Sequence, residues 1–178
     1  SAIGPVSALW MFRCYHDQPH EVFFPETYEE ILGFIYAGLS IRRYLRQTAG
    51  AFFLEHPSRV QLRFFGLQKV ARIYVELIGS DFDITIERLE QTARGQGSTI
   101  MQVYLPLAAA PAGAAIELLR HRGYFLGGVL PRWFDGDGLM MQKLYSEPHF
   151  DTIRLYSLRA EKLLDFIRRD WKEPAANL

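Results

Sequence analysis

A pair of histidines near the start of the chain could bind a metal ion, but its surroundings make this unfavourable. His16 and His20 are four positions apart, with Asp17 and Glu21 beside them. Two histidines at that spacing share one face of a helix, where both could coordinate a metal. Pro19 lies between them and argues against a helix. We therefore predict no metal site.

Other reactive patterns have simpler explanations. Residues 135–138, Asp-Gly-Asp-Gly, resemble a fragment of a calcium loop, but the closing glutamate is missing, and a hairpin turn explains them. Cys14 is the one cysteine, and we interpret it as a small buried hydrophobe instead of a catalytic thiol. The chain has no Gly-x-Ser-x-Gly elbow, Walker loop, dinucleotide fingerprint or Cys-x-x-Cys pair, so phosphate hydrolysis, Rossmann-type redox chemistry and structural zinc lack support.

Length and composition indicate one folded domain over residues 1–178. Apolar residues make up 49% of the chain, which is enough for a sizeable core. Twenty basic and twenty acidic residues cancel, so no overall field attracts DNA or RNA, and no nucleic-acid partner is expected. No apolar run approaches the roughly 20 residues of a membrane span, so no membrane contact is expected. The single cysteine suits a reducing cytoplasm, and because the chain begins with Ser1, we expect a piece of a longer protein.

Hydrophobic periodicity and turn residues predict the elements of the first half of the chain. The apolar positions of the helix are Ile31, Leu32, Ile35 and Leu39, and Pro25 stands near its start. The predictions are a strand at 6–15, a polar loop at 16–25, a helix from 25 to about 38, a short basic helix at 40–47, and two antiparallel strands within 59–79 that turn at 66–69.

The second half alternates between helices and strands. Gly123 ends one helix, and the turn at 135–138 separates two strands of a hairpin. The predictions are helix 84–94, strand 99–107, helix 112–121, strand 125–131, strand 139–145, a C-terminal amphipathic helix at 151–171 and a frayed tail at 173–178.

This order of elements resembles the acetyltransferase-type (GNAT) acyl-CoA-binding fold. Residues 114–124, Ala-Ala-Ile-Glu-Leu-Leu-Arg-His-Arg-Gly-Tyr, resemble the family's penultimate helix and the glycine-aromatic step after it. Residues 123–134 with 138–143, and the helix from residue 25, look like a GNAT-like subgroup that forms a C-terminal module of larger bacterial proteins. The resemblance covers most of residues 25–171 and implies an α/β fold with a mixed central sheet and helices on both faces.

The resemblance also implies where coenzyme A would bind. In active GNAT enzymes, the strand before the third helix splays from its neighbour, and a glycine-rich loop then binds the pyrophosphate through backbone N–H groups. The matching segment here has one glycine, and its two carboxylates oppose a polyanion. Residues 94–99 fit the start of the glycine pattern, but they end a helix, and we interpret them as a C-cap. The candidate cofactor residues are Ile78, Gly79, Ser80, Asp81 and Phe82.

The resemblance implies one candidate general base and leaves the general acid without a candidate. The family often uses a glutamate on the splayed strand, and Glu76 occupies that strand; the alternative is an ordinary outward residue. The family's acid is often a tyrosine four residues before the helix-ending glycine. Leu119 stands there and cannot give a proton to a thiolate, and Tyr124 lies beyond the glycine.

Two function classes stay open. The first is an N-acyltransferase that uses acetyl-CoA or another acyl-CoA to modify a small-molecule or peptide amine, with Glu76 relaying the proton. The second is a catalytically degenerate module for binding or regulation, with a homodimer or an upstream domain as partner. Trp133 and Phe134 are either core or dimer contacts, which we favour, or an exposed aromatic platform. The loop at 78–84 discriminates between the two function classes. Free amides around a cavity favour the enzyme, and acids or Phe82 filling that space exclude it.

Overall fold

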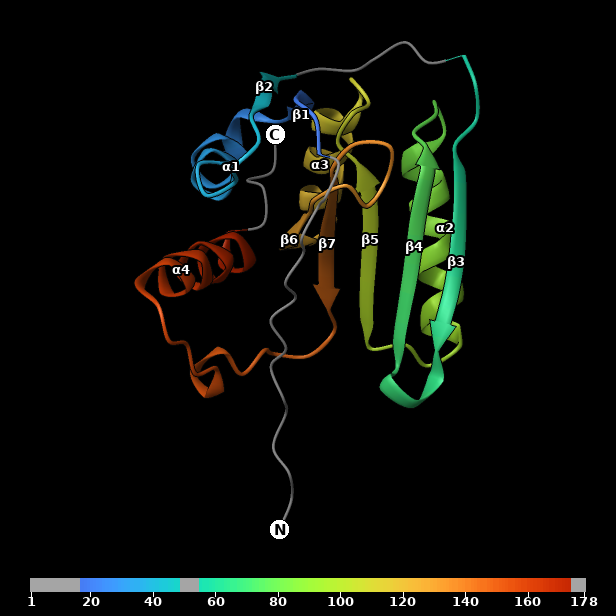
Figure 1. Ribbon diagram of the computed structural model, residues 1–178. Coiled ribbons are helices and arrows are strands. Elements are labelled where there is room, and N and C mark those ends of the chain that lie inside the picture. The colour runs from blue at the N-terminus through green and yellow to red at the C-terminus, as the bar shows by residue number, and fades with distance from the viewer. Residues whose placement is uncertain (1–16, 49–54, 174–178) are drawn as a thin grey trace.

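A five-stranded mixed sheet forms the centre of the computed structural model, which describes residues 17–48 and 55–173 (Figure 1). The strand order in this sheet is β3-β4-β5-β7-β6, and β1 and β2 form a separate two-stranded sheet. The strands are β1 (His20–Phe24), β2 (Arg43–Gln47), β3 (Arg59–Phe65), β4 (Val70–Leu77), β5 (Ile100–Pro106), β6 (Phe125–Leu130) and β7 (Gly138–Leu144). The helices are α1 (Glu29–Tyr36), α2 (Phe82–Gly95), α3 (Ala112–His121) and α4 (Leu158–Lys172).

The pairing of the strands follows from their connections. β3 and β4 are antiparallel and joined by a short turn, in which Lys69 has a φ of 53°. β4 and β5 are parallel, so the chain must cross over between them, and α2 is that crossover. β7 is antiparallel to both β5 and β6. The predicted α/β fold class with a mixed central sheet is therefore confirmed.

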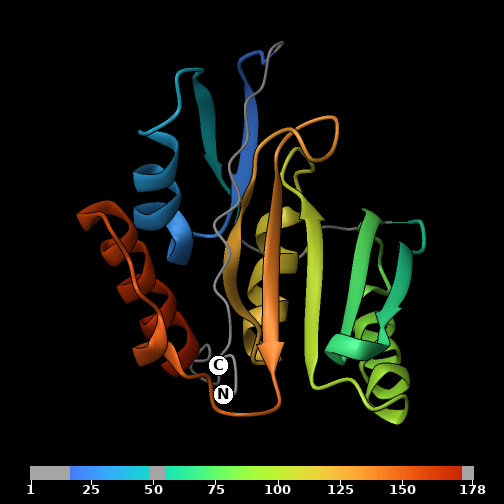
Figure 2. The same ribbon diagram turned by 60° about the horizontal axis from the view of Figure 1, so that its bottom comes forward.

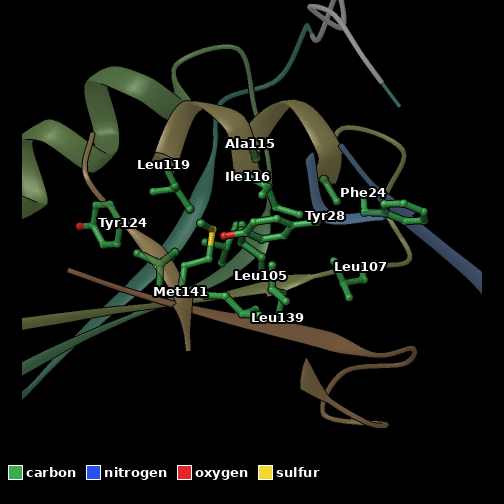
Figure 3. Packing of buried hydrophobic residues seen from close by; sticks show 14 of the residues in the cluster. Phe24, Tyr28, Leu105, Leu107, Ala115, Ile116, Leu119, Tyr124, Leu139 and Met141 are labelled. Carbon is green, nitrogen blue, oxygen red and sulfur yellow. The ribbon is translucent and has the colours of Figure 1, made fainter. Parts of the chain in front are cut away.

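Helices α2 and α3 cover one face of the sheet, and both lie behind it in Figure 1. Alternate residues of β4 and β5 are buried toward these helices, including Ile73, Val75 and Val103. Figure 3 shows Ile116 and Leu119 of α3 packed over the sheet residues below them. The other side chains of β4 and β5 point to the opposite face, which we call the open face because no described helix covers it. The expectation of helices on both faces is therefore wrong for the described residues, because α1 and α4 pack at the β6 edge instead.

Helices α1 and α4 lie together beside the β6 end of the sheet (Figure 2). An edge strand exposes unpaired backbone groups, and here a buried carboxylate binds one of them. Asp170 of α4 accepts hydrogen bonds from the Leu126 N–H at 2.7 Å and from the Tyr28 hydroxyl at 2.6 Å. Arg120 of α3 donates to the same carboxylate at 3.1 Å. One side chain therefore joins α4, α3, β6 and the turn before α1.

Three predicted elements differ from the structure, and each difference has a tertiary cause. The loop expected at 16–25 contains β1, because Val22 and Phe24 are buried and the Phe23 N–H donates to Leu107 O at 2.8 Å. The helix expected at 40–47 is strand β2, which pairs in parallel with β1. The helix expected from residue 151 begins only at Leu158, where Ser157 accepts a cap hydrogen bond from Ala160 N at 3.2 Å.

The other predicted elements of the described residues are close to the observed ones. The helix at 112–121 is confirmed to the residue, and α2 begins two residues before the predicted helix. The two antiparallel strands and the final hairpin are also confirmed. The strand expected at 6–15 and the end of the tail at 173–178 lie outside the described residues.

Removing the carboxylate of Asp170 should destabilise the protein strongly. We expect Asp170→Ala to lower the free energy of unfolding by about 3 kcal/mol, because Arg120 and the Leu126 N–H would lose a buried acceptor. Urea denaturation followed by circular dichroism measures this change. Asp165→Ala, on the exposed side of α4, should change the stability by less than about 0.5 kcal/mol. Equal losses in the two variants would contradict the role of Asp170.

Candidate functional site

The parallel strands β4 and β5 separate at their carboxyl ends, and we call this place the fork. Their pairing runs from Val70 opposite Ile100 to Tyr74 opposite Tyr104 and then stops. Beyond it, β4 stays paired with β3 as far as Leu77, and β5 stays paired with β7. Figure 1 shows the two ribbons diverging toward these ends. The resemblance to GNAT enzymes predicts a splay at this strand.

The loop that follows β4 uses its backbone amides inside the protein. The Gly79 N–H donates to the Ser58 hydroxyl at 3.0 Å, and the Ser80 N–H donates to His56 O at 3.0 Å. The Phe82 N–H donates to Gly79 O at 3.2 Å. A Cβ added to Gly79 would collide with the backbone between His56 and Ser58. The glycine thus allows residues 56–58 to pack directly against this loop.

Three side chains of the loop are also engaged within the protein, two in the core and one in hydrogen bonds. Ile78 and Phe82 are buried in the hydrophobic core. Asp81 accepts hydrogen bonds from the Ser58 N–H at 2.6 Å and from the Thr85 hydroxyl at 3.2 Å. The hydrogen bonds from Ser58 hold the pKa of the Asp81 carboxyl below its ordinary value. A negative charge is therefore fixed at the start of α2, where it opposes phosphate.

Glu76 lies near the carboxyl end of β4, next to the fork. It alternates with the buried residues of β4, so its side chain is on the open face, and it is exposed. Within residues 17–48 and 55–173, its carboxylate has no hydrogen bond or ion pair. Tyr74 precedes it on the same face. The structure thus places Glu76 beside the fork, with no partner for its carboxylate in the described part of the chain.

Three stacked aromatic rings cross the fork on the open face. The ring centroids of Tyr74 and Tyr104 are 4.8 Å apart, and those of Tyr104 and Trp133 are 6.0 Å apart. Trp133 is 42% exposed at the end of the stack, so it does not lie in the core; the expected dimer contact stays a prediction. Sequence reasoning missed Tyr74 and Tyr104, although their place in two alternating strands was a usable signal.

A buried carboxylate fixes the β6–β7 loop that carries Trp133. Asp137 is fully buried, and it accepts hydrogen bonds from Arg43 Nε at 2.7 Å and from the Arg132 N–H at 3.0 Å. His20 Nε2 lies 3.2 Å from the same carboxylate. Burial alone would raise the pKa of Asp137, but the hydrogen bonds from Arg43 and Arg132 outweigh it and hold the pKa below its ordinary value. They also hold Arg132 at a φ of 54°, an unfavourable value for arginine.

Neither residue considered for the general acid reaches the fork. Leu119 is fully buried between α3 and the sheet (Figure 3). Tyr124 precedes β6, and β6 runs in the same direction as β5, so Tyr124 lies at the opposite end of the sheet from the fork. Burial raises the pKa of Tyr124, with Glu90 adding to the effect, so this hydroxyl does not ionise readily.

The other sequence candidates have structural roles or no assigned one. Residues 94–99 end α2 as predicted, with Gly97 at a φ of 79° and the Ser98 N–H donating to Ala93 O at 3.0 Å. His20 lies in β1, and His16, with which it was considered and rejected as a metal pair, is outside the described residues. Among residues 17–48 and 55–173, no three potential ligands gather as a metal site.

No helix in those ranges is long and apolar enough to cross a bilayer.

Comparisons with known proteins give a weak structural likeness and no sequence match. The chain matches no protein-family model, and no curated protein matches it significantly. A solved nourseothricin acetyltransferase is similar in structure, with a TM-score of 0.41 and 18% identity, over 50% of this chain and 58% of that one. The aligned part is thus little more than half the length of that protein. Such a likeness does not by itself establish a shared fold, so the fold class rests on the observed strand order and pairing.

Protonation of Asp137 should weaken the protein at acid pH. Because its pKa is lower in the folded state, its contribution to stability is present above about pH 4 and is lost as the pH falls through the folded pKa. We expect Asp137→Asn to lower the free energy of unfolding by about 3 kcal/mol at neutral pH, and by less at acid pH. Denaturant titrations at several pH values measure this convergence. Asp135→Asn, at an exposed position of the same turn, is the control.

The close packing of residues 56–58 against Gly79 gives a second prediction for this site. Gly79→Ala should destabilise the protein, since its new methyl group would collide with backbone atoms that cannot rotate away. Gly95→Ala is the matched control, because Gly95 is helical with open space around it, and this change should stabilise the protein by roughly 0.5 kcal/mol. Thermal unfolding compares the two. Similar shifts in both variants would contradict the packing.

Proposed function

We propose that this chain is a GNAT-like domain that transfers an acyl group from acyl-CoA to an amine. The observation that carries the proposal is the fork, where parallel strands stop pairing after Tyr74 and Tyr104. Beyond that point, the facing edges of β4 and β5 do not pair with each other, and an extended chain with amide groups can add to such an edge. The pantetheine arm of coenzyme A is a chain of this kind.

The end of the β4–β5 pairing supports coenzyme A at the fork, and the loop after β4 does not support it. The amides of Gly79, Ser80 and Phe82 already have acceptors, and Asp81 adds a negative charge. By the criterion that the loop at 78–84 provides, this result counts against the enzyme, and the proposal rests on the fork alone. We therefore place the amide-bearing arm in the fork and assign no pyrophosphate site to residues 78–82. The coenzyme supplies an acyl group activated as a thioester.

Glu76 is the residue to which we assign proton transfer. As the amine nitrogen forms its bond to the acyl carbon, the carbon–sulfur bond breaks and sulfur leaves as the thiolate. Glu76 accepts the proton that the nitrogen loses. Leu119 cannot protonate the thiolate, so water supplies that proton. The rings of Tyr74 and Tyr104 bound the site on the open face and exclude water from one side.

A second function is favoured by a specific observation. Because the Gly79 and Ser80 amides are used internally and Leu119 is in the core, the domain could keep the fold without the chemistry. It would then be a binding or regulatory module, as the resemblance to modules of larger bacterial proteins suggests. Binding of coenzyme A separates the two functions.

Calorimetric titration with coenzyme A and with acetyl-CoA tests the proposal. We expect saturable binding at micromolar concentration. Ser80→Asp should weaken it at least about tenfold, since the exposed Ser80 side chain would place a new carboxylate beside the fork. Ser146→Asp adds the same charge at the other end of the sheet and should leave the affinity unchanged. No heat at millimolar ligand would support the degenerate module.

Glu76→Gln tests the assigned role of Glu76 in a protein that binds the coenzyme. Thiol release should be followed over a panel of amines. We expect the rate of transfer to fall by about 100-fold or more, because the amide cannot accept a proton, while the affinity for acetyl-CoA stays the same. Undiminished transfer by Glu76→Gln would exclude Glu76 as the base.

A further inference from the structure

A row of polar side chains crosses four strands of the open face. The strand register places Arg63 of β3 opposite Arg72 of β4, Arg72 opposite Gln102 of β5, and Gln102 opposite Gln142 of β7. Residues paired in this way point to the same face. The neighbouring row toward the fork contains Tyr74 and Tyr104, two rings of the stack. An arginine pair and an aromatic surface are therefore adjacent on one side of the sheet.

The two arginines lack compensating negative charge. Like charges directly opposite each other on paired strands repel. Among residues 17–48 and 55–173, no carboxylate forms an ion pair with Arg63 or Arg72. The remaining residues of the chain include no aspartate or glutamate, so no acidic side chain outside those ranges can compensate them. This charge complementarity points to an anionic ligand.

Arg72 is also held in position for an anion. Its Nε donates to Gln102 Oε1 at 2.9 Å, and its guanidinium lies 4.3 Å from the centre of the Phe65 ring. These contacts use Nε and one face of the group. Its two terminal nitrogens have no hydrogen bond to a described residue, and such a pair of nitrogens matches the two oxygens of a carboxylate or phosphate.

Three different types of side chain follow one another along the open face of β4. Arg72, Tyr74 and Glu76 occupy alternate positions, so their side chains share that face. At about 3.3 Å per residue, the Cα atoms of Arg72 and Glu76 are roughly 13 Å apart. Tyr74 lies between them along the strand. Its ring stacks on Tyr104 and has the Arg63 guanidinium 5.5 Å from its centroid, so a ligand would meet the edge of the ring. A ligand spanning this line would meet a cation first, then an aromatic ring and finally a carboxylate.

We propose that the acyl acceptor is an amine that carries an oxyanion, either a carboxylate or a phosphate, at the far end of a flat unit. Arg72 binds the oxyanion, Tyr74 contacts the flat unit, and Glu76 faces the amine nitrogen. This inference rests on the proposed function for the role of Glu76, but the oxyanion site of Arg72 and its neighbours does not depend on catalysis.

Binding of matched amines to the full chain tests this proposal without any coenzyme. The probes are tyramine, O-phosphotyramine and 4-(2-aminoethyl)benzoate, and calorimetry measures their affinities. We expect the phosphate or the carboxylate probe to bind at least about tenfold more tightly than tyramine, since a charged hydrogen-bonded pair is worth that factor. The tighter of the two anionic probes identifies the oxyanion.

Variants locate the site. Arg72→Gln should remove the preference for the anionic probe, and Arg63→Gln, at an exposed position, should reduce it if the first variant is unstable. Arg88→Gln on α2, across the sheet, should keep the preference. Equal affinities for all probes, no binding of any probe, or a preference that survives both open-face variants would overturn the proposal.

The same probes separate this inference from the proposed function. Anion-dependent binding without acetyl transfer would keep the oxyanion site and exclude the transferase. Acetyl transfer to tyramine as fast as to the anionic probes would keep the transferase and exclude the oxyanion preference.

Discussion

β4 and β5 pair with each other only as far as Tyr74 and Tyr104, and the rest of the site depends on that limit. Each strand keeps its other partner to its end, β3 for β4 and β7 for β5. Beyond these residues, each strand is held only by that other partner, and the two strands separate. The separation leaves unpaired edges beside Glu76, which is the feature that an extended ligand can use.

Buried carboxylates hold elements in place at two separate positions of the sheet. Asp137 fixes the β6–β7 loop and thereby the ring of Trp133. Asp170 joins α4 to the edge strand β6 at Leu126. In both cases, one acceptor satisfies donors from segments that are distant in sequence, so neither contact has a local signature. Buried acceptors of this kind are costly to remove because their partners cannot regain water.

The loop after β4 and the open face give opposite indications about charge. The loop holds Asp81 at the start of α2 and has already used the amides of Gly79 and Ser80. The open face holds Arg63 and Arg72 without an acidic partner in the described part of the chain. The loop where the resemblance expects the pyrophosphate is therefore negative. The two arginines lie on the paired part of β3 and β4, before the strands separate. The structure thus says more about the charge of the acyl acceptor than about the binding of coenzyme A.

The sequence by itself determined most elements of the sheet, because β-strand alternation and glycine turns are local signals. The helix at 112–121 and the two antiparallel strands before Gly79 needed no tertiary information. Glu76 could be placed on its strand, and the acidic character of the loop at 78–84 could be read directly.

Only the tertiary structure decided which of these residues meet. β1 and β2 form strands because Val22 and Phe24 are buried against the rest of the core, a requirement that local composition does not carry. The register across β3, β4, β5 and β7 aligned Arg72 with its polar neighbours, and the end of the β4–β5 ladder produced the fork. Register and strand separation depend on pairing between distant segments, so no single stretch of residues encodes them.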